Sequence, residues 1–136
     1  MKVLFRTLFF LFIAFGSCFS FAGPSWQAVN PLIGQDELRD FAHGANDYVL
    51  VGTGGLIVYS PDGVTWSTIN PVITDNLYGV TWSGTHQQYV AVGDNGRIIF
   101  SADGQTWKIV PTTGNTLYDV FWNPDLQEYV FIGASG

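Results

Sequence analysis

The chain has 136 residues, of which 47% are hydrophobic and 16% aromatic, and its formal net charge is −6. Beyond residue 22, three basic residues stand against eleven acids, a formal charge of −8. Binding to a phosphate backbone needs clustered Lys and Arg, so this composition excludes nucleic acid as a partner. Acids scattered along a chain are typical of a solvated, soluble surface.

The first 22 residues have the three-part pattern of a secretory signal peptide. Lys2 and Arg6 give a positive start, residues 8–15 form an unbroken apolar run, and small residues follow up to Ala22. A bilayer-spanning helix needs about 20 apolar residues, and this run is shorter. We therefore predict cleavage after Ala22, no membrane insertion after cleavage, and export to the periplasm or the medium.

Cys18 is the only cysteine in the chain, and it allows a second interpretation of the N-terminus. The segment Phe-Gly-Ser-Cys at 15–18 resembles a bacterial lipoprotein box, in which the cysteine is lipidated and becomes the new N-terminus. A lipoprotein anchor through Cys18 is therefore the alternative to simple cleavage. Neither case leaves an internal disulfide, which favours a fold with a sufficient hydrophobic core.

The rest of the chain repeats with a period of 40 or 41 residues. Three sets of residues keep this spacing: Trp26, Trp66 and Trp107; Tyr48, Tyr89 and Tyr129; Gly52, Gly93 and Gly133. A period of about 40–45 residues built from short strands is typical of propeller blades. We therefore predict that residues 23–136 form one propeller domain, with repeats at about 26–65, 66–106 and 107–136.

The middle repeat shows the strands of one blade most clearly. Apolar and aromatic segments at 77–82, 89–93, 97–101 and 106–110 predict four strands separated by polar turns. The Asp-Asn-Gly turn at 94–96 is a strong hairpin signal, and no helical periodicity interrupts the pattern. The predicted fold class is all-β, with each repeat a four-stranded antiparallel meander, which is one blade of a β-propeller.

The first and last repeats of this sequence are partial. Residues 26–29 align with a fourth strand, and Gly136 lies in the turn after a second strand. About two full blades and parts of others are therefore predicted, whereas propellers usually have about 4 to 8. We interpret the chain as a fragment of a longer protein; a short chain that closes a ring by oligomerising is the alternative. Self-association through unpaired blade edges is expected.

Two seven-residue segments, SPDGVTW at 60–66 and SADGQTW at 101–107, share five residue types at the same places. The shared residues are Ser60, Asp62, Gly63, Thr65, Trp66, Ser101, Asp103, Gly104, Thr106 and Trp107. Glycine supplies the positive φ of a tight turn, and aspartate can accept bonds from backbone N–H groups. We predict structural turns, called the motif turns below, with tryptophans buried between blades. They should lie between the third and fourth strands of a blade, on the face opposite the ligand-binding loops. A calcium or catalytic role of the aspartates is the alternative.

The pattern Ser-x-Asp-Gly-x-Thr-Trp resembles the Asp-box, also called the bacterial neuraminidase repeat. Through this motif and the blade period, the chain beyond residue 22 is similar to Asp-box β-propellers, and most similar to the photosystem II assembly and stability factor-like group. Asp-boxes also occur in sialidases and sortilin-type receptors, so the motif is specific for architecture and not for function. Resemblance to the photosystem factors implies a face that binds nascent membrane-protein segments.

The resemblance also allows an enzymatic alternative, a fragment of a sialidase-like glycoside hydrolase. Sialidases clamp their substrate with three arginines, and an Arg-Ile-Pro segment normally precedes the first box. Beyond residue 22 this chain has only Arg39 and Arg97, and neither precedes Ile-Pro. Catalytic residues of such an enzyme would lie outside this chain. His43 and His86 are accompanied by neither a cysteine nor a second nearby histidine, so exposed loop histidines are favoured over a metal site. We predict no catalytic residues, no metal site and no cofactor.

A candidate binding surface remains on the first strand of each blade, which lines the propeller channel. Arg39, Tyr78 and Tyr118 share one place in successive first strands, and Asp40 and Asp119 share the next. Such a ring of residues could contact a peptide or a sugar; packing of the tyrosines between blades is the alternative. We predict an exported, non-enzymatic propeller that binds a protein or polysaccharide partner. A purely structural adhesion module is the further alternative.

Overall fold

The computed structural model describes residues 19–22, 25–28 and 37–134. The chain divides into two compact units, residues 1–30 and 31–136. In the first unit, β1 (Phe19–Ala22) pairs antiparallel with β2 (Ser25–Ala28). Strand β2 coincides with most of the predicted fourth strand, and β1 falls at the end of the predicted signal peptide. Cys18 and the apolar run before it lie outside the described residues, so cleavage and lipidation stay predictions.

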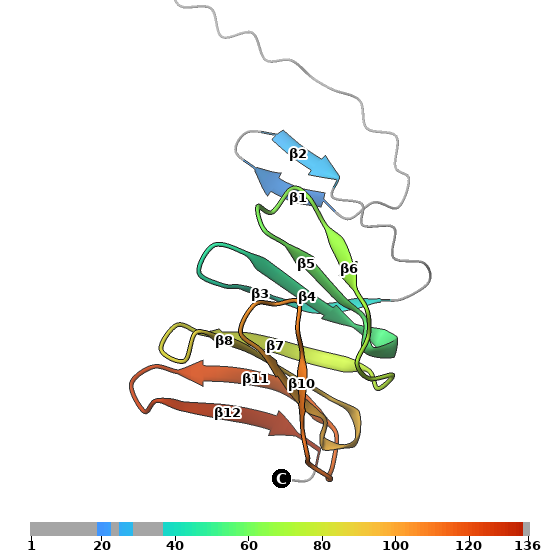
Figure 1. The fold of residues 1–136 in the computed structure, drawn as a ribbon, viewed down its shortest axis with the longest axis vertical. Coiled ribbons are helices and arrows are strands. Elements are labelled where there is room, and N and C mark those ends of the chain that lie inside the picture. The colour runs from blue at the N-terminus through green and yellow to red at the C-terminus, as the bar shows by residue number, and fades with distance from the viewer. Residues whose placement is uncertain (1–18, 23–24, 29–36, 135–136) are drawn as a thin grey trace, which may run out of the picture. The chain divides into compact units, whose positions relative to one another are not determined.

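In the second unit, the described residues 37–134 form three antiparallel sheets, each with its strands in chain order (Figure 1). The first sheet consists of β3 (Leu38–His43), β4 (Tyr48–Gly52), β5 (Ile57–Ser60) and β6 (Ser67–Ile69). The second consists of β7 (Leu77–Ser83), β8 (Gln88–Gly93), β9 (Ile98–Ser101) and β10 (Lys108–Val110). The third consists of β11 (Leu117–Asn123) and β12 (Glu128–Gly133). The four strands predicted for the middle repeat are therefore confirmed as β7 to β10.

A glycine closes the second strand of each sheet, because a side chain there would meet the segment that enters the first strand. Gly52, Gly93 and Gly133 each pair with the leucine that begins the first strand, next to a register shift. A Cβ on Gly93 would overlap the carbonyl oxygen of Asn76, and a Cβ on Gly52 would overlap that of Glu37. Short 3-10 turns, η1 (Thr53–Gly55) and η2 (Asp94–Gly96), follow the first two of these glycines.

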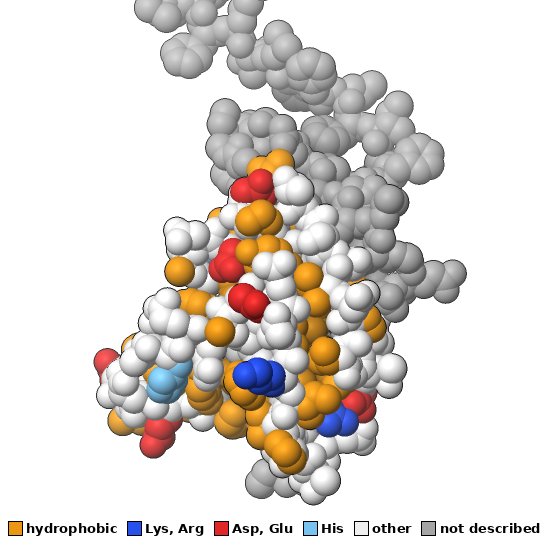
Figure 2. Space-filling view, in the orientation of Figure 1, with side chains coloured by type: hydrophobic (Ala, Val, Ile, Leu, Met, Phe, Trp, Pro, Cys, Tyr) orange, Lys and Arg blue, Asp and Glu red, His pale blue; other side chains and the backbone are white. Residues whose placement is uncertain are grey.

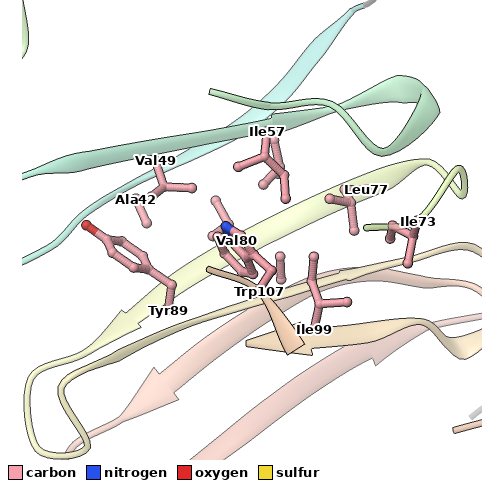
Figure 3. Close-up of a cluster of buried hydrophobic side chains, with 11 residues drawn as sticks. Ala42, Val49, Ile57, Ile73, Leu77, Val80, Tyr89, Ile99 and Trp107 are labelled. Atoms are coloured by element: carbon pink, nitrogen blue, oxygen red, sulfur yellow. The ribbon is translucent and has the colours of Figure 1, made fainter. Parts of the chain in front are cut away.

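The main hydrophobic core lies between the first and second sheets. Its buried residues are Ala42, Val49, Val51 and Ile57 from the first sheet, Ile73 from the connection, and Leu77, Val80, Tyr89, Ala91, Ile99 and Trp107 from the second. Figure 3 shows the labelled side chains of the two sheets directed into the space between them. Successive side chains of a strand lie on opposite faces of the sheet. Val49 and Val51 therefore share the face of β4 that is turned to the second sheet, and Tyr89 and Ala91 share the face of β8 that is turned to the first.

A second core joins the second and third sheets. It contains Val90, Val92 and Val120, with Ile98, Phe100, Leu117 and Tyr129 packed against them. The middle sheet is therefore apolar on both faces, which suits a layer between two others. Strand β7 lies between β3 and β11, so the three first strands are neighbours (Figure 1).

Stacked four-stranded meanders with adjacent first strands are the blades of a β-propeller. The predicted fold class is thus confirmed: an all-β, incomplete propeller with two full blades, β3–β6 and β7–β10, and the two-stranded sheet β11–β12. In the part of the chain that the structure describes, no apolar helix has the length to cross a bilayer.

Candidate functional site

Each motif turn joins the third and fourth strands of its blade, and its aspartate binds the turn backbone. Asp62 Oδ1 accepts hydrogen bonds from the backbone N–H groups of Val64 (2.8 Å) and Thr65 (2.7 Å). Asp103 Oδ1 accepts the matching bonds, from Gln105 (2.9 Å) and Thr106 (2.6 Å). The carboxylates are therefore occupied within their own turns.

The serines and glycines complete the two turns. The hydroxyl of Ser60 donates to Asp62 Oδ1 (3.1 Å), and its oxygen accepts from the Gly63 N–H (2.8 Å). The Ser101 hydroxyl donates to the carboxylate of its own turn in the same way (2.9 Å). Gly63 and Gly104 have φ angles of 75° and 69°, which favour glycine. Among the described residues, no three His, Cys, Asp or Glu side chains are grouped as metal ligands would be.

These hydrogen bonds hold the pKa of both motif aspartates well below its ordinary value. The pKa of Asp62 is lowered from 3.8 to about 2, chiefly by the hydrogen bond from the backbone N–H of Thr65 and then by that from Val64. Asp103 also falls to about 2, with the backbone N–H of Thr106 as the main cause. Because hydrogen bonds stabilise the charged form of each acid, folding and ionisation of the two carboxylates are linked.

Acid should therefore weaken the fold through these two turns. Each pKa is lower in the folded chain, so the stabilisation is complete above about pH 4 and is lost as the pH falls towards 2. We expect D62N/D103N to be less stable than the unmodified chain at pH 5, with a smaller further loss down to pH 2. Urea unfolding followed by circular dichroism between pH 5 and 2 measures this.

Asp125→Asn is the matched control, because it removes a carboxylate from an exposed turn. It should leave the acid dependence of the unfolding free energy close to that of the unmodified chain. Equal loss of stability on acidification in D62N/D103N and in the unmodified chain would contradict the linkage.

The two motif tryptophans differ in their burial, contrary to the prediction that both are buried. Trp107 is 6% exposed, and its Nε1 donates to the Gly104 carbonyl oxygen (3.0 Å). Trp66 is only half-buried, and its Nε1 has no hydrogen-bond partner among the described residues. The cause is the neighbouring blade. The turn of Trp107 packs against Tyr59 and Val49 of the first blade, whereas residues 37–134 provide no blade before β3.

The predicted binding residues Arg39, Tyr78 and Tyr118 lie side by side across β3, β7 and β11. The Arg39 guanidinium carbon is 6.0 Å from the centroid of the Tyr78 ring, a cation–π distance. The Tyr78 and Tyr118 ring centroids are 5.9 Å apart with a tilt of 53°. Tyr118 is 53% exposed, and the Arg39 side chain is 44% exposed and pairs with Glu37 (2.7 Å). We call these three residues the Arg-Tyr-Tyr row.

Polar residues of the turns fix the centre of this row. The Tyr78 hydroxyl donates to Asp94 Oδ1 (3.0 Å), and Asn76 Nδ2 donates to the other oxygen of that carboxylate (2.9 Å). Asn76 Oδ1 in turn accepts from the Gly54 N–H of the preceding blade (2.9 Å). Tyr78 is therefore held in one orientation between two blades. Sequence reasoning missed Asn76, and treated the Asp-Asn-Gly turn mainly as a hairpin signal.

Asp40 and Asp119, predicted beside the row, both accept hydrogen bonds from backbone N–H groups. Asp40 Oδ1 accepts from its neighbour Phe41 N–H (2.8 Å), and Oδ2 accepts from Val80 N–H of the next blade (2.8 Å). Asp119 Oδ1 accepts from Val120 N–H in the same local geometry (2.7 Å). The carboxylate of Asp40 thus joins two blades and is not presented at the row.

Charge is dispersed over the described surface. Figure 2 shows Asp and Glu side chains scattered over the visible face, with few Lys and Arg among them. Asp75 forms an ion pair with Arg97 (2.8 Å), and both side chains are largely buried. The exposed His43 and His86 rings lie against aromatic side chains, at 4.5 Å from Tyr48 and 4.7 Å from Trp122 between centroids. Within the row, Arg39 is the cation, and it lies over the Tyr78 ring.

These features define the described chain as an incomplete, antiparallel β-propeller with a partly exposed Arg-Tyr-Tyr row on its first strands. Among solved structures, it is similar to YCF48 bound to D1 peptide, with a TM-score of 0.63 and 18% sequence identity. The match covers 84% of this chain and 38% of that one, so this chain spans well under half the length of its structural neighbour. No family model and no curated protein matches the sequence.

Proposed function

We propose that the chain is an exported, non-enzymatic propeller that binds an extended peptide segment of a protein partner along the Arg-Tyr-Tyr row. The observation that carries this proposal is the row itself: one cation and two tyrosine rings in contact, aligned across three strands and exposed at Tyr118. Exposed aromatic and Arg side chains are the residue types that dominate binding energy at protein interfaces.

The dimensions and chemistry of the row fit a peptide. Arg39 lies 6.0 Å from the Tyr78 ring, and the Tyr78 and Tyr118 rings are 5.9 Å apart, so each step is close to the length of about two residues of extended strand. Tyrosine rings offer apolar area at low entropic cost, and Arg39 supplies a partner for a carboxylate. Since Tyr78 is already held by Asp94, little ordering is needed on binding.

Two further observations support this function. The similar structure holds YCF48 bound to D1 peptide, so a related fold accommodates a peptide ligand. Asp94, which binds Tyr78 of the row, also accepts from Asn76, and Asp75 is paired with Arg97, which favours a structural role for both acids over catalysis. Export rests on the pattern of residues 1–22.

Truncation of Tyr118 should weaken peptide binding with little effect on the fold, because its ring is exposed. An array of synthetic peptides selects ligands for the unmodified chain, and fluorescence anisotropy gives their dissociation constants. We expect Tyr118→Ala to weaken these at least about tenfold, as for a central aromatic contact. Arg39→Ala should weaken most the peptides that carry a carboxylate.

Leu126→Ala is the matched control, since Leu126 is also exposed (64%) but lies in the turn at the other end of β11. It should bind like the unmodified chain. Equal affinity of Tyr118→Ala and Leu126→Ala would overturn the proposed site. Selective binding on a glycan array would instead identify a polysaccharide partner, and turnover of sialosides would contradict a non-enzymatic protein.

A further inference from the structure

Each blade presents a forward face to the next sheet, and among the described residues nothing covers the forward face of the third sheet, β11–β12. On the first blade this face consists of Ala42, Val49 and Val51, all buried against the second blade. The strand registers place Phe121, Val130 and Ile132 at the corresponding positions of the third sheet. These side chains are 57%, 44% and 57% exposed. We call them, with Glu128, the tail face.

The backward face of the first blade is the other half of the same kind of interface. On the second blade this face contains Val80, Tyr89 and Trp107, which are buried against the first blade. The corresponding residues of the first blade are Phe41, Tyr48 and Trp66. Phe41 is 65% exposed, the other two are half-buried, and Trp66 Nε1 is without a hydrogen-bond partner within residues 37–134. We call these three residues the head face.

A polar contact between consecutive sheets also repeats. The hydroxyl of Tyr89 donates to Asp47 Oδ1 of the preceding blade (2.6 Å). One repeat later, Gln88 Nε2 donates to the Tyr129 hydroxyl oxygen (3.1 Å). The residue before each repeat tyrosine thus binds the tyrosine of the following sheet. Glu128 stands before Tyr129 and is exposed, so the tail face offers the acceptor that the next tyrosine would need.

We propose that the tail face of one copy packs on the head face of a second copy. Phe121, Val130 and Ile132 then cover Phe41 and Trp66, and Glu128 accepts a hydrogen bond from the Tyr48 hydroxyl. A second copy is favoured as the occupant because this chain carries both halves of an interface that it already forms internally between consecutive sheets. The contact differs from the strand-edge pairing predicted from the sequence, since it uses sheet faces.

Because the two faces are different surfaces, the contact is heterologous, and repetition gives a ring or an open filament. This inference does not depend on the proposed peptide site, since the Arg-Tyr-Tyr row lies on other residues.

Sedimentation velocity of the full chain over a range of concentrations tests the proposal. Phe121→Asp blocks the tail face and Phe41→Asp blocks the head face; both side chains are exposed, so the fold should tolerate the change. We expect each variant alone to be monomeric where the unmodified chain associates. An equimolar mixture should form dimers and nothing larger. The free tail face of Phe41→Asp packs on the free head face of Phe121→Asp, and the two faces left on that dimer both carry the blocking aspartate.

Leu126→Asp is the control, as it adds the same charge at an exposed position outside both faces. It should associate like the unmodified chain, and all variants share residues 1–22, so any association through that segment cancels. Glu128→Ala and Tyr48→Phe test the polar contact with gentler changes: each should weaken association, and the pair together no further.

Three results would overturn the proposal. One is an unmodified chain that stays monomeric at every concentration. Another is a Phe121→Asp variant that associates as strongly as the Leu126→Asp control. The last is association of Phe41→Asp alone, which would indicate tail-to-tail contact. Circular dichroism and urea midpoints establish that each variant is folded; if an aspartate variant unfolds, the Glu128 and Tyr48 variants decide the outcome.

Discussion

Replacing Trp107 by alanine is expected to destabilise the second unit by about 3–5 kcal/mol, the usual cost of truncating a buried tryptophan. The side chain is 6% exposed, lies in the main core with Tyr89, and donates a hydrogen bond to Gly104. Its loss leaves a cavity between two blades and an unpaired carbonyl oxygen.

The same replacement at Trp66 should cost much less, although the two tryptophans end identical motifs. Trp66 is half-buried and its Nε1 forms no hydrogen bond with the described residues, so less contact is lost. Urea unfolding followed by far-ultraviolet circular dichroism measures both variants without relying on tryptophan fluorescence. The Phe121→Asp background keeps association through the tail face out of the measurement.

Equal losses of stability for the two variants would show that Trp66 is covered to the same degree as Trp107. A loss below about 1 kcal/mol for Trp107→Ala would contradict its place in the core, since small losses are typical of surface substitutions.

The second large effect is expected from Gly93→Ala, a change of a single methyl group. The φ angle of Gly93 is −168°, which any residue can adopt, so backbone preference is not the reason. The added Cβ would overlap the Asn76 carbonyl oxygen, and β7 would have to move away from β8. Overpacking of this kind costs about 1–3 kcal/mol or more.

This movement of β7 should also displace Tyr78 of the Arg-Tyr-Tyr row. The Asn76 carbonyl oxygen accepts the Asp94 N–H (3.0 Å), and the Asp94 carboxylate holds Tyr78. Gly93→Ala should therefore weaken peptide binding as well as stability. Gly114→Ala is the control, because nothing lies within 4 Å of its Cβ position; it should change the free energy of unfolding by less than about 0.5 kcal/mol.

Urea unfolding and peptide titration of both variants check this prediction. If Gly93→Ala and Gly114→Ala unfold at the same urea concentration, close approach of the Asn76 carbonyl does not explain the repeated glycine.

The strands of the second unit were predictable because their signals are local. Tight turns such as residues 94–96 and the two motif turns mark the ends of strands, and the forty-residue period fixes which strand is which. The prediction that the motif turns lie between third and fourth strands followed from the order of these signals alone.

The partners of the side chains were harder to predict, because they depend on contacts between blades. Asp40 binds the backbone of Val80, and Tyr89 binds Asp47, residues about forty positions apart. Identical motifs gave identical predictions for Trp66 and Trp107, yet their burial depends on which sheet lies against them. A single sequence reports the repeat, whereas the neighbours of each repeat come only from the fold.

The hydrogen bonds from Tyr89 to Asp47 and from Gln88 to Tyr129 also bear on how the chain folds. Each bond closes a loop of about one repeat, and closing that loop has an entropic cost. Only the packing of two sheets against each other can offset this cost. A single blade leaves half of its core without a partner, and docking completes core and bond together. Folding of the second unit should therefore be cooperative between neighbours, as in other arrays whose repeats are stabilised by their interfaces, with the central blade, bound on both sides, the last to open.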